Sequence, residues 1–184
     1  EGMDSAIKYK RSTSTKTKVF LIGMPKFDYY LNKLNTNSTV NNIGICTNTL
    51  DDVDDIFKLC QLIRNKIPAI CIAIRPHPRD ISRLKQWKKL AIHFSASYSD
   101  SQHESSFSFL TTVDAIISGN SSILLDSALL NVYPLMLGNS DEVIDYYGFV
   151  KNGVVESIMN NEQIITKLKQ LINHKPVIRG QATY

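Results

Sequence analysis

Short apolar runs alternate along the chain with segments of helical period. Buried strands of a parallel sheet read as continuous apolar runs, and the helices that cover both faces of such a sheet read as amphipathic segments. The pattern therefore predicts an α/β fold, a Rossmann-like parallel sheet flanked by helices, in a single domain. The expected strands are residues 18–23, 42–49, 69–74, 92–96, 114–119 and 133–138.

Amphipathic segments between these runs predict the helices. Asp51 or Asp52 can cap a helix that continues to about Asn65, with a buried face formed by Val53, Ile56, Phe57, Cys60 and Ile63. A second amphipathic helix is expected at 80–91, with Ile81, Leu84, Trp87 and Leu90 on its buried face. Residues 95–106 are rich in serine and lack periodicity, which is typical of a loop. Further helices are expected at 25–34, 106–113, 121–131 and 161–173.

The excess positive charge lies at the N-terminus. Residues 1–18 hold five basic and two acidic side chains, which is +3 of the net +4 of the 184-residue chain. A solvated, poorly ordered end explains this charge better than a nucleic-acid site. We expect a polar basic segment at 1–17, one domain at 18–175 and a tail at 176–184. The chain begins at Glu1, and we interpret it as a fragment of a longer protein.

Cysteine usage indicates a reducing compartment. Cys46, Cys60 and Cys71 are odd in number, lie in apolar segments and lack the CxxC spacing of zinc ligands. We expect three buried, unpaired thiols and a soluble, cytoplasmic protein, because the sequence has no secretory signal and no apolar run that could span a membrane. Peripheral contact of the full protein with the inner face of the cell membrane stays open. No acidic cluster has metal-ligand spacing, so no metal is expected.

Two motifs follow expected strands. The first, "IAIRPHPRD" at 72–80, holds His77 between two prolines, and the second is "SGNSSILLD" at 118–126. Ligands of open parallel sheets bind beyond the carboxyl ends of the strands. We therefore predict that His77 and the serine pair Ser121 and Ser122 face one cleft at the ends of neighbouring strands.

The second motif has the chemistry of a phosphate site. Gly119 permits a tight turn, Asn120 or Ser121 can cap the next helix, and Ser121 and Ser122 offer hydroxyls and backbone amides to a phosphate. Asp126, one turn later, can accept hydrogen bonds from a ribose. An ordinary serine cap is an open alternative.

For His77 the open alternative to phosphate binding is a structural role, in which the imidazole only forms a hydrogen bond with a loop carbonyl. Arg75 and Arg79 can add charge to the cleft or be solvated. In the serine-rich loop, Glu104 and His103 could approach an acceptor, although a solvated loop is the simpler interpretation. Asp145, Tyr146 and Tyr147 could line the rim of the pocket.

The segments "GMPKFDYYL", "IGICTNT", "IAIRPHP" and "VDAIISGNSSILLDSALLNVYPLML" also carry a family resemblance. In order and spacing, residues 18–137 resemble the C-terminal half of bacterial cell-surface polymer transferases. These are CDP-glycerol glycerophosphotransferases, polysialyltransferases and capsule transferases with HP and serine-pair motifs. The resemblance implies the C-terminal domain of a GT-B fold, with His77, Ser121 and Ser122 on the donor phosphate and Asp126 on the nucleoside. The glycerophosphotransferases usually have an aspartate and a tyrosine before the serine pair, where this chain has Gly119 and Asn120.

The implied function is binding of the nucleotide-activated donor by a glycosyltransferase or glycerophosphotransferase of capsule, lipopolysaccharide or teichoic-acid-like polymer synthesis. The donor is CMP-, CDP- or UDP-linked and is a substrate, so no cofactor is expected. The resemblance places the catalytic base in an N-terminal domain outside this sequence, and it implies a glycan or polymer acceptor and no nucleic acid. Two alternatives stay open: a non-catalytic nucleotide- or partner-binding module, and a nucleotide-sugar epimerase of similar architecture.

Overall fold

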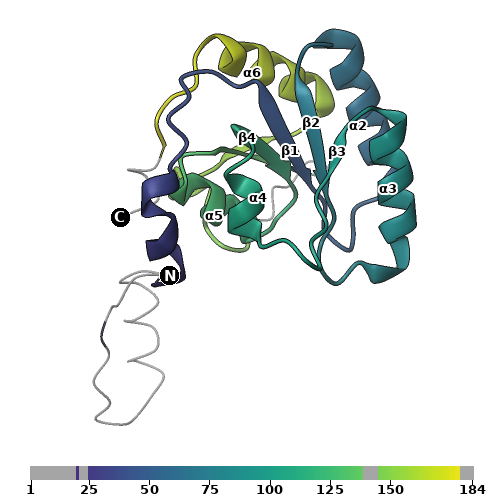
Figure 1. Ribbon diagram of the computed structural model, residues 1–184. Helices are drawn as coiled ribbons and strands as arrows, with labels where there is room; N and C mark the ends of the chain where they lie inside the picture. The colour runs from purple at the N-terminus through teal and green to yellow at the C-terminus, as the bar shows by residue number, and fades with distance from the viewer. Residues whose placement is uncertain (1–19, 21–24, 139–144, 179–184) are drawn as a thin grey trace.

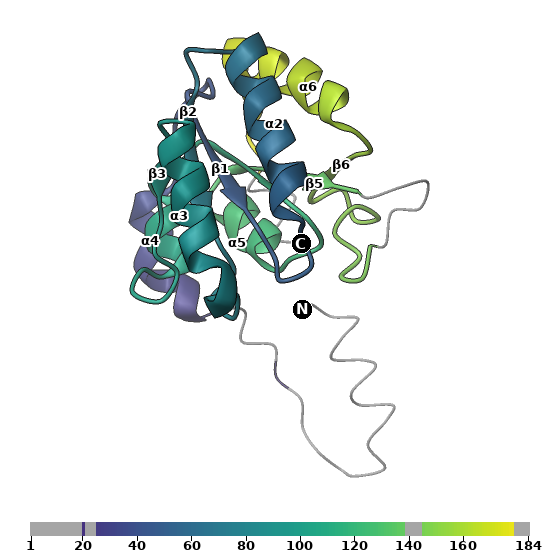
Figure 2. The ribbon, with the colours of Figure 1, turned by 90° about the vertical axis from the view of Figure 1, so that its right-hand side faces the viewer.

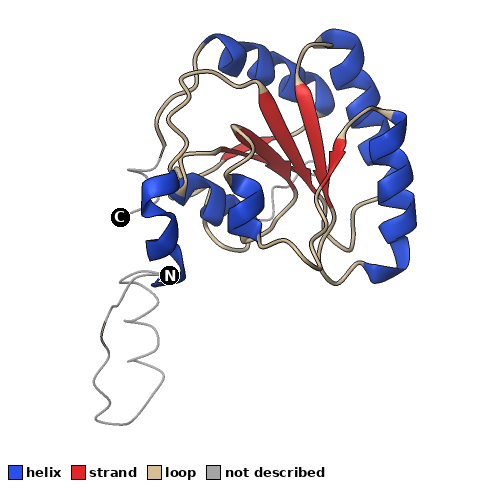
Figure 3. Ribbon diagram, in the orientation of Figure 1, coloured by secondary structure: helices blue, strands red, loops and turns tan. Residues whose placement is uncertain are grey.

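A computed structural model of the protein describes residues 20, 25–138 and 145–178. Its sheet has six strands in the order β3-β2-β1-β4-β5-β6 (Figures 1 and 3). Each neighbouring pair is parallel, so the predicted parallel sheet is confirmed. The strands are β1 (Asn42–Cys46), β2 (Cys71–Arg75), β3 (Ser97–Tyr98), β4 (Ala115–Ser118), β5 (Tyr133–Leu137) and β6 (Glu156–Ile158).

Helices cover both faces of the sheet (Figures 1 and 2). On one face lie α2 (Val53–Lys66), α3 (Leu84–His93), which follows the 3-10 turn η2 (Ile81–Arg83), and α6 (Asn161–Asn173). On the other lie the 3-10 helix η1 (Pro25–Lys33), α4 (Ser106–Leu110) and α5 (Ile123–Leu129). Each face has its own apolar core, and the doubly covered sheet predicted from the sequence is confirmed. Among the described residues, no helix is long and apolar enough to cross a membrane.

Strand β1 shows how the two cores are divided. Ile43 and Ile45 are fully buried in the core beneath α2, while Gly44 faces the opposite core. A Cβ at Gly44 would lie 2.7 Å from Cζ of Phe109. The missing side chain therefore lets the Phe109 ring of α4 lie directly on the sheet.

Capping residues fix the starts of the two longest helices. The Asp52 carboxylate accepts a hydrogen bond from the backbone N–H of Asp54 at 2.7 Å and begins α2, as one of the two expected caps. Asn160 accepts from the backbone N–H of Gln163 at 2.9 Å and begins α6, whose bounds match the predicted helix.

The structure differs from the sequence-based expectation at the edges of the sheet. Residues 92–96 do not form a strand, because α3 continues to His93 and the chain then turns at Ser95, whose φ is 49°. The edge strand is the two-residue β3 that follows. The three-residue β6 was not predicted, because its apolar run is too short to stand out. The strand expected at 18–23 lies outside the described residues apart from Phe20.

Two predicted buried side chains are exposed. Ile81 is 66% exposed because it belongs to η2 and not to the face of α3 that buries Trp87 and Leu90. Cys71 is exposed at the first position of β2, whereas Cys46 and Cys60 are buried. All three cysteines are unpaired, as predicted.

A polar network closes the amino edge of the sheet. The buried Asp114 carboxylate accepts hydrogen bonds from the side chains of Asn35 (3.0 Å), Asn37 (2.6 Å) and Asn42 (3.1 Å), and from the backbone N–H groups of Asn41 (3.0 Å) and Asn42 (2.9 Å). These bonds join the start of β4 to the segment that leads into β1.

The buried Lys175 extends this network to the C-terminal segment. Its Nζ donates to Oδ1 of Asn35 at 2.8 Å and to the carbonyl of Asn131 at 2.7 Å. The backbone N–H of Ile178 donates to Oδ1 of Asn131 at 3.0 Å. The packed part of the chain therefore extends to Ile178, which is itself buried.

Candidate functional site

A cavity of about 240 Å³ opens where the strand order reverses, between β1 and β4. Open α/β sheets bind ligands at this switch point, beyond the carboxyl ends of the strands. Ile45, Ile117 and Met136 are its fully buried apolar residues, and the loops after β1, β4 and β5 complete it. The residues from these loops include Asn48, Leu50, Asp51, Gly119, Asn120 and Gly138.

The loop after β1 is held in one conformation by its own side chains. Oδ1 of Asn48 accepts hydrogen bonds from the backbone N–H groups of Leu50 (2.7 Å) and Asp51 (3.1 Å). In return, Oδ2 of Asp51 accepts from the backbone N–H of Asn48 at 2.7 Å. These three bonds place the Asn48 amide and the Asp51 carboxylate at the cavity.

Gly119 is required by the close approach of these groups. A Cβ at this position would lie 2.8 Å from Nδ2 of Asn48 and 3.6 Å from Oδ1 of Asp51. The pKa of Asp51 is raised above its ordinary value, mainly because burial disfavours the carboxylate, and the backbone hydrogen bond from Asn48 and the charge of Arg83 offset only part of this effect.

The HP motif forms a tight turn after β2. His77 is half-buried, its Nδ1 accepts a hydrogen bond from the backbone N–H of Arg79 at 3.1 Å, and its carbonyl accepts from that of Asp80 at 2.9 Å. Because Nδ1 is an acceptor, the neutral imidazole carries its proton on Nε2. The turn thus presents His77 as an Nε2–H donor. Arg79 is exposed.

Arg83 ties this turn to the loop after β1. Its guanidinium lies 2.7 Å from Oδ2 of Asp80 and donates to the carbonyls of Asp51 (2.5 Å), Thr49 (3.0 Å) and Asn48 (3.3 Å). Asp80 is also held by Nε1 of Trp87 at 2.8 Å. The His77 turn and the wall of the cavity are therefore one connected unit.

The serine pair lies between β4 and α5. Ser121 is half-buried and Ser122 is exposed, and the Ser122 hydroxyl makes no capping hydrogen bond to the helix. Asp126 is buried and its Oδ2 accepts from the hydroxyl of Ser106 on α4 at 3.4 Å. Neither serine is fully buried, whereas the Asp126 carboxylate faces α4.

The two motifs share one edge of the sheet, but not neighbouring strands. Strand β1 lies between β2, which precedes His77, and β4, which precedes the serine pair. The prediction that the two motifs follow neighbouring strands is therefore wrong, because the order of motifs along the sequence does not give the order of strands in the sheet. Of the predicted site residues, Gly119 and Asn120 line the switch-point cavity, and His77, Ser121, Ser122 and Asp126 do not.

Arg75 has an internal role. Its guanidinium is buried and donates to the hydroxyl of Ser99 at 2.5 Å and to the carbonyl of Glu104 at 2.7 Å, and it lies 5.3 Å from the centre of the Phe109 ring. Nη1 also lies 3.6 Å from Oε2 of Glu104. These contacts use the charge of Arg75 to anchor the loop after β3, so it is not directed at the cavity.

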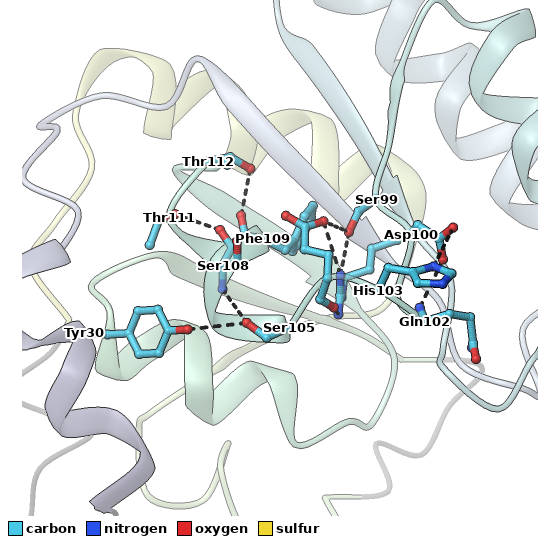
Figure 4. A network of polar contacts seen from close by, with 12 residues as sticks. Tyr30, Ser99, Asp100, Gln102, His103, Ser105, Ser108, Phe109, Thr111 and Thr112 are labelled. Carbon is cyan, nitrogen blue, oxygen red and sulfur yellow. Dashed lines mark hydrogen bonds and ion pairs between the residues drawn. The ribbon is translucent and has the colours of Figure 1, made fainter.

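The same loop makes further polar contacts (Figure 4). Nδ1 of the exposed His103 lies 3.4 Å from Oδ2 of Asp100, and the Ser105 hydroxyl accepts from the backbone N–H of Ser108 at 3.0 Å, which caps α4. The side chain of Gln102 donates to the carbonyl of Pro78 in the HP turn. Glu104 and Arg75 thus belong to the scaffold of this loop, and His103 projects outside it.

The predicted rim residues form a separate turn. Oδ2 of Asp145 accepts from the backbone N–H of Lys151 at 2.9 Å, and the Tyr147 ring stacks on Phe149 with centroids 5.0 Å apart. Tyr146 is 78% exposed. None of the three lines the switch-point cavity.

Sequence analysis did not identify three residues of this site: Asn48 and Asp51, which line the cavity, and Arg83, which holds the loop that carries them. Asn48 lies at the end of an expected strand and was detectable by the rule that placed His77. Asp51 was considered only as a helix cap, and Arg83 has no motif signal. Among the described residues, no group of three histidine, cysteine or acidic side chains could hold a metal ion.

No protein-family model and no curated protein sequence matches this chain. Solved structures do match. The C-terminal CMP-Kdo binding domain of WaaA from Acinetobacter baumannii has 10% identity and a TM-score of 0.56, over 77% of this chain and 88% of that chain. The chain has the fold of this domain. The C-terminal domain of the glycosyl transferase LpcC from Francisella tularensis is similar at 14% identity and a TM-score of 0.52, over 77% of this chain and 80% of that one.

A longer protein contains the same fold as one part. The UDP-GlcNAc 2-epimerase from Neisseria meningitidis, bound to UDP-GlcNAc, has 17% identity and a TM-score of 0.55, over 98% of this chain and 46% of the epimerase. This chain therefore spans under half of that enzyme. The predicted Rossmann-like fold of a GT-B C-terminal domain is confirmed by these similarities, which at such identities concern the fold alone.

Proposed function

We propose that this chain is the nucleotide-donor-binding domain of a glycosyltransferase or glycerophosphotransferase that acts in bacterial capsule, lipopolysaccharide or teichoic-acid-like polymer synthesis. The observation that carries the proposal is the cavity at the switch point, between the loops of Asn48 and Gly119. A concave site with an apolar floor and a few convergent polar groups is typical of small-molecule binding.

The site residues have distinct proposed roles. His77 donates from Nε2 to a donor phosphate, and the hydroxyls of Ser121 and Ser122 bind the same group. Asp126 lies four residues after Ser122, on α5, and the role on the nucleoside that we propose for it requires its carboxylate to turn away from Ser106 of α4. Stabilising the charge on the departing nucleotide lowers the barrier to transfer, while the acceptor hydroxyl is activated by a group outside this chain. The donor is CMP-, CDP- or UDP-linked, and no separate cofactor is needed.

The ligands of the structural neighbours support this choice. The WaaA domain is described as binding CMP-Kdo, and the Neisseria enzyme holds UDP-GlcNAc. The wall teichoic acid polymerase TagF, soaked with CDPG, shares the fold with a TM-score of 0.55 over 39% of its chain. Three unpaired cysteines are consistent with a cytoplasmic site of action, with the acceptor polymer at the inner face of the membrane.

An epimerase of nucleotide sugars is the second candidate, because the Neisseria epimerase covers 98% of this chain. A non-catalytic nucleotide-binding module is the third. Incubating the full-length protein with the nucleotide sugar that it binds separates the three. Transfer to an acceptor, inversion at a sugar carbon and no chemical change are distinguished by following the sugar in NMR spectra.

A thermal-shift panel of CMP, CDP, UDP and GDP tests the proposal. A nucleotide at about a hundred times its dissociation constant adds about 2.7 kcal/mol to the free energy of unfolding. For a domain of this size that corresponds to a rise of about 5–10 °C in melting temperature. A shift with one nucleotide base is expected. No shift with any of the four, at millimolar concentration, would overturn the proposal.

A further inference from the structure

The switch-point cavity offers a hydrogen-bond donor whose orientation is fixed. Oδ1 of Asn48 is engaged by two backbone N–H groups, so the amide cannot rotate without losing both bonds. Nδ2 must then face Gly119, 2.8 Å from the position that a Cβ there would occupy. Among the described residues Nδ2 of Asn48 has no hydrogen-bond acceptor, and its two N–H groups are available to a ligand.

An acceptor lies beside this donor. Oδ2 of Asp51 is engaged by the backbone N–H of Asn48, and Oδ1 is on the Gly119 side of the carboxylate. An amide donor next to a carboxylate acceptor matches two adjacent hydroxyl groups, because each hydroxyl can both donate and accept.

The size and floor of the cavity limit what can enter. Its volume of about 240 Å³ is below the roughly 300–1,000 Å³ of sites that hold a whole drug-sized ligand, so it accommodates one ring or a short polyol. Ile45, Ile117 and Met136 supply an apolar surface for the C–H groups of such a ligand.

Charge limits the ligand further. Asp51 is the one charged side chain among the residues that line the cavity in the described structure. An adjoining cavity of about 530 Å³ shares Asp51 and adds Asp52, Asp55 and Glu162, and its lining in the same part of the chain contains no lysine or arginine. A ligand group with a carboxylate would be repelled by this surface.

We infer that the switch-point cavity binds the sugar or polyol group of the donor, and that this group is uncharged. Asn48 and Asp51 hold its hydroxyls, and the donor continues past Gly119 and Asn120 to its phosphates at the serine pair. This inference rests on the proposed function. It excludes acidic sugars as the preferred donor group.

Calorimetric titration of the chain with pairs of ligands tests the inference. Each pair compares a nucleotide with a donor that carries it: CDP with CDP-glycerol, UDP with UDP-GlcNAc, GDP with GDP-mannose, and CMP with CMP-N-acetylneuraminate. For the base that binds, we expect the neutral donor to bind about tenfold or more tightly than its nucleotide. The acidic donor is expected to bind no more tightly than CMP.

Two kinds of result would count against these ideas. Equal affinities within the neutral pair, or a preference for the acidic donor, would overturn the inference and leave the proposed function standing. If no nucleotide binds, the proposed function is refuted instead.

Two nearly isosteric variants assign the effect to the cavity. Asp51→Asn keeps a side-chain oxygen that accepts the hydrogen bond from the backbone N–H of Asn48. Asn48→Asp keeps an oxygen for the backbone N–H groups of Leu50 and Asp51 but replaces the N–H groups of the amide. Each should weaken the neutral donor about tenfold and leave the nucleotide alone unchanged. Asp54→Asn is the matched control, since this exposed carboxylate lies on α2 and lines neither cavity. Equal losses for donor and nucleotide, or loss in the control as well, would contradict the assignment.

Discussion

The two edges of the sheet are both rich in polar side chains, yet they differ in how these side chains are satisfied. At the amino edge, five donors converge on Asp114, and Lys175 completes the network with two acceptors. At the carboxyl edge, the amide of Asn48 and the carboxylate of Asp51 each use only part of their hydrogen-bonding capacity, and both line a cavity.

This difference separates a structural polar cluster from a binding site. Buried polar groups that bond one another stabilise a fold, because leaving any of them unpaired is costly. Polar atoms that are held rigidly but left open to a cavity are available to a ligand. The amino edge should therefore respond to mutation in stability, and the carboxyl edge in affinity.

The largest effect is expected from Asp114→Ala at the amino edge. The variant leaves several buried N–H donors and Lys175 without their acceptor or counter-charge, so we expect the free energy of unfolding to fall by about 3 kcal/mol or more. Urea denaturation measures this loss. Asp28→Ala removes an exposed carboxylate and should change the free energy by less than about 0.5 kcal/mol. A small loss for Asp114→Ala, or a loss of nucleotide affinity in the folded variant, would break the distinction between the two edges.

The pH dependence contributed by Lys175 is a second test of the amino edge. Burial lowers its pKa to about 8, although the charge of Asp114 opposes the shift. The unfolded chain then holds more protons than the folded one from about pH 8 up to the ordinary lysine pKa near 10.4, so this contribution to stability rises with pH. Across pH 8–9 wild type should gain on the order of 1 kcal/mol relative to Lys175→Met in urea unfolding.

Taking the difference between the two proteins cancels the opposite contribution of the thiols of Cys46 and Cys60, whose pKa burial raises to about 12. A difference that stays flat with pH would mean that Lys175 is fully charged in the fold.

His77→Ala tests the carboxyl edge. Loss of a charge-assisted hydrogen bond to a donor phosphate costs about 1.5–3 kcal/mol, or roughly ten- to a hundredfold in nucleotide affinity. The fold should change little, because the side chain is half-exposed and contributes little to the core. Calorimetric titration and a melting curve are measured together, with the exposed His103→Ala as the control. Unchanged affinity with a lowered melting temperature would assign His77 to holding its turn, through the bond from Arg79.

The smallest effect is expected for Cys71→Ser. Cys71 is exposed while Cys46, at the cavity, and Cys60 are buried. At pH 8 a thiol reagent should modify one cysteine quickly in the folded protein and three in denaturant, and the variant should lose the fast phase with a stability change within about 0.5 kcal/mol. Rapid reaction of Cys46 would show a cavity that opens to solvent. Fewer than three thiols in the unfolded, unreduced chain would contradict the unpaired state.

The sequence by itself determined the class of fold and most of its elements. Apolar runs and amphipathic segments are local patterns, and α6 was predicted to its observed bounds because its periodicity and the Asn160 cap agree. The prediction failed at β3 and β6, which have two and three residues at the sheet edges. Such short strands are defined by their pairing with a neighbouring strand, and two or three residues are too few to show a periodic pattern.

The sequence also placed His77, Gly119 and the serine pair at the carboxyl edge, because the end of a strand is a local property. Only the tertiary structure decided the strand order, which puts β1 between the two motifs and makes Asn48 and Asp51 part of the cavity. It likewise decided that Arg75 is bound by Ser99 and Glu104, 24 and 29 residues away. Strand order and such partners arise from packing between distant segments, and no local pattern encodes them.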